Sequence, residues 1–118
     1  MIIDKSILGA LSDLTKANRR LRQAMGLRNS PDDLSQRMLN ALESGTVMPI
    51  HRHHTLLEIV VILRGKIEWV FYYDKGGETE RAVLGANGEP GMINVERDRR
   101  HSLNCIGSAV LFESKNGA

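Results

Sequence analysis

The sequence of 118 residues predicts an all-β domain, a sandwich or small barrel, preceded by one α-helix. An apolar stripe with helical spacing occupies the N-terminus, and short β-type runs separated by turn residues follow from Gln36 onward. The composition, with 42% hydrophobic and 25% charged residues, is typical of a globular protein. We expect one domain over residues 1–118, with a helical segment over 1–30 and a β-barrel over 36–115.

The N-terminal helix is expected from about Asp4 to Met25, with its apolar face covering a sheet. Gly26 would end it, and Ser30–Asp33 has the composition of a turn. The apolar residues of the stripe recur at steps of three, four and seven: Ile7, Leu8, Leu11, Leu14, Leu21 and Met25.

Short strands separated by turns are expected in the rest of the chain. Tight hairpins are expected at Arg64–Lys66 and Asp74–Gly77, and a longer loop at Gly85–Gly91. The expected strands are Arg37–Leu42, Val47–His53, Leu56–Leu63, Ile67–Tyr73, Thr79–Leu84, Met92–Val95, His101–Cys105 and Ala109–Glu113.

One of these strands carries aromatic side chains at alternate positions. Trp69, Phe71 and Tyr73 share one face and Val70 and Tyr72 the other, so both apolar sets cannot face a single core. Exposed sheet edges also need cover. We therefore expect a homodimer.

Composition argues against several classes of partner. A net charge of +2 and 4% aromatic residues do not favour nucleic acid, although a pI near 8.9 suits an anionic ligand. No stretch approaches the roughly 18 apolar residues of a membrane span. The acidic start differs from a secretory signal, and Cys105 is the single cysteine. We expect a cytoplasmic protein with no nucleic-acid or membrane partner.

Three histidines fall within four positions of GTVMPIHRHHTLLEIVVILRG. His51 and His53 project to the same face of a strand, and Glu58 lies inside an apolar run where an unpaired carboxylate is costly. A divalent metal bridging these three residues would explain both features, with His101 as a candidate fourth ligand. Such donors suit Fe, Mn, Co, Ni, Cu or Zn rather than Ca or Mg. The alternative is a solvated turn or strand edge.

The same spacing resembles the first signature motif of the cupin superfamily, G-x5-H-x-H-x4-E-x6-G. Its fixed positions here are Gly45, His51, His53, Glu58 and Gly65. In the second motif, GMINVERDRRHSLN supplies Gly91, His101 and Asn104, while Glu96 and Asp98 replace the usual Pro and Gly.

A narrower resemblance covers nearly the whole chain. The helix with its arginines, the run Gln36–Leu42 and the closing Val110–Gly117 look like the small bacterial cupin-fold metalloproteins of the WbuC type. The resemblance implies a double-stranded β-helix (jelly-roll) barrel with one divalent transition metal. It also implies a role in biosynthesis of O-antigen or another surface polysaccharide.

Arginines are the candidates for binding an anionic substrate. Arg99 and Arg100 adjoin His101, Arg37 would face the barrel interior or its rim, and Arg19, Arg20 and Arg22 form another basic patch. Each run is either a solvated face or an anion clamp, since guanidinium groups bind carboxylate or phosphate bidentately.

The leading functional hypothesis is a metal-binding cupin acting on a small, anionic, sugar-related molecule, with the metal as Lewis acid. The reaction would be an isomerisation or epimerisation, but the sequence identifies no general base. One alternative is an Fe(II)-dependent dioxygenase. Another is a non-catalytic cupin that binds a sugar or metal.

Overall fold

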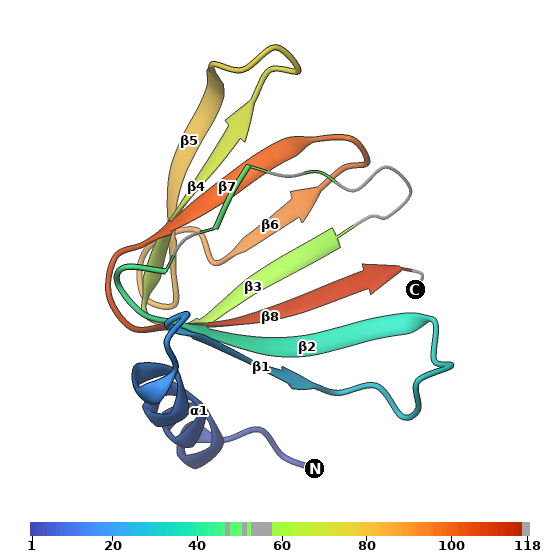
Figure 1. The fold of residues 1–118 in the computed structure, drawn as a ribbon, viewed down its shortest axis with the longest axis vertical. Coiled ribbons are helices and arrows are strands. Elements are labelled where there is room, and N and C mark those ends of the chain that lie inside the picture. Colours follow the sequence, from blue (N-terminus) through green and yellow to red (C-terminus); the bar gives the residue numbers. More distant parts are fainter. Residues whose placement is uncertain (47, 51, 53–57, 117–118) are drawn as a thin grey trace.

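The computed structural model describes residues 1–46, 48–50, 52 and 58–116 of the chain. Within these residues one N-terminal helix is followed by strands alone (Figure 1), so the predicted all-β architecture with an N-terminal helix is confirmed. The elements are α1 (Lys5–Ala17), β1 (Arg22–Gly26), β2 (Ser35–Leu42), β3 (Glu58–Arg64), β4 (Lys66–Tyr72), β5 (Glu78–Gly85), β6 (Met92–Val95), β7 (Arg100–Cys105) and β8 (Ala109–Asn116).

The strands form two antiparallel sheets that face each other. The larger has the order β1-β2-β8-β3-β6 and the smaller the order β5-β4-β7. Strands of both sheets converge at one end of the molecule and spread apart toward the other (Figure 1). Buried residues from both sheets fill the space between them: Leu42, Val60, Ile62, Ile67, Trp69, Phe71, Leu84, Val95, Leu103, Ala109 and Leu111.

The helix is shorter than the sequence predicts. It begins after Asp4, whose carboxylate accepts a hydrogen bond from the backbone N–H of Ile7 at 3.1 Å, and it ends at Ala17 instead of Met25. Leu21 takes a left-handed backbone conformation (φ 54°), and the next residues form β1. The four-residue step from Leu21 to Met25 suits a helix, but pairing with β2 decides the structure.

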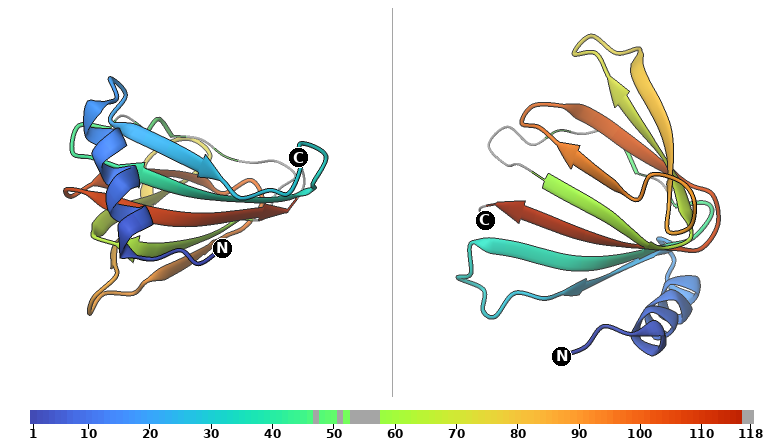
Figure 2. Two further views of the ribbon diagram at one scale, coloured as in Figure 1. Left: turned by 90° about the horizontal axis from the view of Figure 1, so that it is seen from below. Right: turned by 180° about the vertical axis from the view of Figure 1, so that it is seen from behind.

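The helix covers part of the outer face of the larger sheet, as expected. It packs against β1, β2 and β8 (Figure 2), where Leu11 is buried with Leu39, Ala41 and Val110. No helix in the described part of the chain has the length and apolarity to cross a membrane.

The turn at Arg64–Lys66 carries the chain from one sheet to the other, so the predicted hairpin there is wrong. β3 belongs to the larger sheet and β4 to the smaller one. Gly65 has φ +77°, and a Cβ at this position would collide with the backbone carbonyl of Ser108. The hairpin at Asp74–Gly77 is confirmed, since β4 pairs with β5.

The aromatic strand β4 uses both of its faces within one chain. Trp69 and Phe71 enter the core between the sheets, and Val70 is buried on the opposite face. Tyr73, just beyond the strand, is exposed. The two apolar sets therefore do not require a second chain, and the homodimer stays a prediction.

Candidate metal centre

A cavity of about 140 Å³ lies between the two sheets, beside the core. Four strands, β2, β3, β7 and β8, bring polar side chains to it. These side chains continue the alternation by which the apolar residues of each strand face inward. The lining residues are Met38, Asn40, Met48, Glu58, Trp69, His101, Leu103, Glu113 and Lys115.

Glu58 begins β3 and is only 4% exposed. Its two carboxylate oxygens have different neighbours. Oε1 lies 3.8 Å from Nε2 of His101, and Oε2 lies 3.3 Å from Nζ of Lys115. Lys115 is directly opposite Glu58 in the β3–β8 register, where side chains of paired residues meet. The Lys115 ammonium therefore compensates the charge of a carboxylate that the fold removes from water.

His101 lies on β7 and is 1% exposed. Its Nδ1 is 2.8 Å from the carbonyl oxygen of Arg99, which accepts a hydrogen bond and cannot donate one. Nδ1 therefore carries the proton, and in the neutral ring the lone pair is on Nε2, the nitrogen that faces Glu58. The Trp69 ring stacks on the imidazole, with centroids 5.0 Å apart and planes at 14°. Packing and hydrogen bonding thus fix the orientation of the ring.

This arrangement fits a metal ligand pair. Metal-binding histidines usually donate their second N–H to a carbonyl or carboxylate, as His101 does to Arg99. The separation of 3.8 Å between Nε2 and Oε1 is shorter than two metal–ligand bonds of about 2.0–2.2 Å laid end to end, so one ion can contact both atoms. Lys115 holds the other carboxylate oxygen, Oε2.

The structure brings together Glu58 and His101, two of the four residues expected to bind metal. His51 and His53 lie outside the described residues. Within the described ranges, no three His, Cys, Asp or Glu side chains group closely enough to hold an ion.

Lys115, Glu113 and Asn40 also line the cavity, but sequence reasoning did not single them out. The available signal was the continuation of β8: Leu111, Glu113 and Lys115 occupy alternate positions and share the inner face. The expected strand ended at Glu113, whereas β8 runs to Asn116. When the end of a strand is predicted from its last apolar residue, the polar residues that continue the strand and line a cavity are left out.

The three arginines expected to bind substrate do not line this cavity. Arg37 lies on the opposite face of β2 from Met38, and its Nη2 pairs with Asp33 at 3.0 Å. Hydrogen bonds from the backbone N–H groups of Ser35 and Asn29, with help from Arg37, lower the pKa of the Asp33 carboxyl.

Arg99 and Arg100 have other neighbours too. The Arg99 guanidinium lies 4.0 Å from the centre of the Phe71 ring and pairs with Glu80 and Glu96 at 3.6 and 3.8 Å. Arg100 donates to the carbonyl of Asp74 at 2.6 Å, at the β4–β5 hairpin. Both arginines therefore stabilise the surface around β7.

Comparison with solved structures identifies the fold. The chain is similar to the Cnp3 cupin domain of Schizosaccharomyces pombe (TM-score 0.65, 16% identity, 82% of this chain and 61% of that one). It is also similar to the capsular polysaccharide assembling protein CapF from Staphylococcus aureus (TM-score 0.70, 18% identity, 86% of this chain and 29% of that one). Oxalate oxidase in complex with the substrate analogue glycolate is similar too, with a TM-score of 0.68 and 14% identity. That match covers 86% of this chain and 53% of oxalate oxidase. The chain thus spans less than two thirds of these proteins, and the likeness shows that it has the cupin fold.

Comparison of sequences identifies the family. No curated protein matches the chain. The model of a domain of unknown function, DUF6016, matches residues 3–84, which include β3, β4 and most of β5. This match covers more than half of the sequence. The chain is therefore a member of the DUF6016 family.

Proposed function

We propose that this cupin domain binds one divalent transition metal through His51, His53, Glu58 and His101 and acts on a small anionic molecule. The observation that carries the proposal is the approach of Glu58 and His101 to 3.8 Å inside a cavity, from strands of different sheets. Burying a carboxylate and an imidazole costs free energy that their pairing with Lys115 and Arg99 offsets, and a bound metal would add a favourable interaction with both groups. The metal would be Fe, Mn, Co, Ni, Cu or Zn.

The residues around the pair provide polar contacts for a small substrate. When bound, the metal would supply Lewis acidity to polarise a substrate oxygen. Lys115 places an ammonium group beside Glu58, and Asn40 offers an amide that can donate or accept hydrogen bonds. Glu113 is a second carboxylate at the cavity and a candidate for moving a proton.

The proposed substrate is sugar-related, as in the surface-polysaccharide context of WbuC-type proteins. CapF, named as a capsular polysaccharide assembling protein, is in keeping with this context. The alternative is an Fe(II)-dependent oxidation. Oxalate oxidase, whose structure in complex with the substrate analogue glycolate is similar to this chain, is in keeping with an oxidation. Turnover with Zn in the site would exclude the oxidative alternative, because Zn²⁺ has no redox chemistry.

Fluorescence of Trp69 provides a direct test. It is the single tryptophan of the chain and stacks on His101, so a bound paramagnetic ion such as Co²⁺ or Cu²⁺ should quench it. We expect saturable quenching at one equivalent, weakened at least about tenfold by Glu58→Gln.

Glu89→Gln is the matched control for this titration. Glu89 pairs with Lys66 at 2.9 Å, as Glu58 pairs with Lys115, but it does not line the cavity. Equal quenching in the two variants, or none in the wild-type protein, would contradict the proposal.

A further inference from the structure

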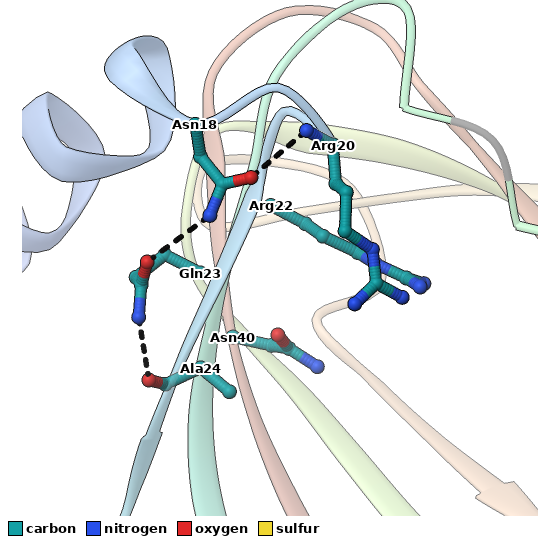
Figure 3. A pocket seen from close by; sticks show the side chains of 6 residues that line it. All are labelled: Asn18, Arg20, Arg22, Gln23, Ala24 and Asn40. Atoms are coloured by element: carbon teal, nitrogen blue, oxygen red, sulfur yellow. Dashed lines mark hydrogen bonds between the residues drawn. The ribbon is translucent and has the colours of Figure 1, made fainter.

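A second pocket, of about 320 Å³, adjoins the inner side of β1 and β2 (Figure 3). It is lined by Asn18, Arg20, Arg22, Gln23, Ala24 and Asn40. None of these lining residues is acidic, so the pocket has a formal charge of +2. The first cavity, by contrast, contains Glu58 and Glu113 beside its lysine.

Arg20 and Arg22 differ from Arg37 and Arg99 in their partners. Within the described part of the chain, neither guanidinium pairs with a carboxylate, whereas Arg37 and Arg99 do. Arg22 donates through Nη1 to the thioether sulfur of Met48 at 3.0 Å, and a thioether is a weak acceptor. The strong donors of both side chains are thus available to an oxyanion.

The local structure directs these two side chains. The Asn18 side-chain oxygen accepts a hydrogen bond from the backbone N–H of Arg20 at 2.8 Å, and its amide nitrogen donates to Gln23 at 3.3 Å. These bonds hold the turn between α1 and β1. In Figure 3 the Arg20 side chain runs downward and the Arg22 side chain runs to the right, and both end above the Asn40 side chain in this view.

The pocket adjoins the candidate metal centre. Asn40 lines both spaces, and Met48, which contacts Arg22, lines the metal-site cavity. Asn40 faces inward because its cross-strand partner on β8 is Leu111, which belongs to the core between the sheets. Its partner on β1 is Ala24, which lines the second pocket. A small molecule that contacts Asn40 in one space therefore lies beside the other space.

We propose that Arg20 and Arg22 bind the phosphate group of a phosphate monoester whose remaining part extends toward Glu58 and His101. Two guanidinium groups that pair with no carboxylate of the described residues match a dianionic phosphate better than a monoanionic carboxylate. This inference rests on the proposed function, which places the reacting part of the substrate at the metal centre. It narrows the substrate class to phosphorylated small molecules.

Titration calorimetry with inorganic phosphate and with a hexose 1-phosphate tests the inference on the whole chain. We expect both to bind at low ionic strength, and acetate to bind at least about tenfold more weakly. Arg20→Gln and Arg22→Gln should each weaken phosphate binding about fivefold to tenfold, and the double variant more than either. Circular dichroism and the melting temperature establish that each variant is folded.

Arg19→Gln is the matched control, because Arg19 adjoins Arg20 in sequence but does not line the pocket. Its phosphate affinity should equal that of the wild-type protein. Unchanged affinity in the double variant, an equal loss in Arg19→Gln, or tighter binding of acetate than of phosphate would overturn the inference.

Metal content of the same samples separates this inference from the proposed function. A double variant that loses phosphate binding and keeps its metal supports both. Protein without metal that still binds phosphate through Arg20 and Arg22 would refute the metal proposal and leave the phosphate site intact. Metal-containing protein that does not bind phosphate would refute the phosphate site alone.

Discussion

The two ends of the interior between the sheets differ in chemistry although the same strands supply both. On β3, the inward-facing Val60 and Ile62 are apolar, whereas Glu58 at the start of the strand is charged. On β8, Leu111 belongs to the core, whereas Lys115 lines the cavity. From Glu58 to Ile62 the register between β3 and β8 is regular, and only the side chains change.

The difference shows how this fold separates stability from function. Burial of apolar side chains favours folding, whereas burial of carboxylate and imidazole groups opposes it unless each group finds a partner. The apolar end should therefore carry most of the stability of the domain. The polar end should carry the ligand chemistry, and substitutions at the two ends should separate the two properties.

The largest expected effect on stability is at the apolar end. Leu111 is completely buried in the core between the sheets. Leu111→Ala should lower the free energy of unfolding by about 2–5 kcal/mol, because it removes buried methyl groups and leaves a cavity. Urea denaturation measures this, with Ile59→Ala on the exposed face of β3 as the control. Equal losses in the two variants would refute the assignment of the core.

At the polar end, Glu58→Gln should have a smaller effect on stability and a large effect on metal affinity. The amide preserves the shape of the side chain and weakens the contact with Lys115, so we expect a loss of about 1–2 kcal/mol in unfolding free energy. Metal affinity should fall at least about tenfold. Urea denaturation and a metal titration on the same sample measure both. A stability loss as large as that of Leu111→Ala, with unchanged metal affinity, would make Glu58 a structural residue.

Arg100→Ala should have little effect on either property. Its guanidinium donates to the carbonyl of Asp74 at the hairpin and does not line the cavity. We expect less than about 1 kcal/mol of lost stability and unchanged metal content, whereas His101→Ala, one residue away, should loosen metal binding. Elemental analysis compares the two. Loss of metal in Arg100→Ala would place its side chain at the site.

The smallest effect concerns Cys105, at the other end of the strand that carries His101. Burial raises the pKa of its thiol, and a backbone hydrogen bond with Gly107 offsets only part of this effect. At a given pH the folded protein therefore contains less thiolate than a free cysteine does. Reaction with a disulfide reagent at pH 8 should be slower than after unfolding, and equal rates would contradict the burial.

Much of the fold was predictable because the alternation of apolar residues is a local signal. β6, Met92–Val95, was predicted to the residue for this reason. β1 was not, because Leu21 and Met25 are spaced for a helix and for a strand alike, and only pairing with β2 distinguishes the two. The crossing between sheets at Gly65 was also not predictable, since a short turn with glycine resembles a hairpin.

For the candidate site, spacing located Glu58 and His101, which the fold brings together. Charge alone did not distinguish among the arginines. Arg37, Arg99 and Arg100 were selected for their position in the sequence, but the strand face and nearby carboxylates determine which guanidinium groups have partners. Arg20 and Arg22 could be selected only after the turn following α1 was known.

The central claim is that the polar end of the interior binds a metal. Elemental analysis of protein purified without added metal tests it most directly, on the wild-type chain and on the His51→Ala/His53→Ala double variant. We predict close to one first-row transition metal per wild-type chain and an empty site in the folded double variant. Wild-type protein without metal, or stoichiometric metal retained in the double variant, would contradict the claim.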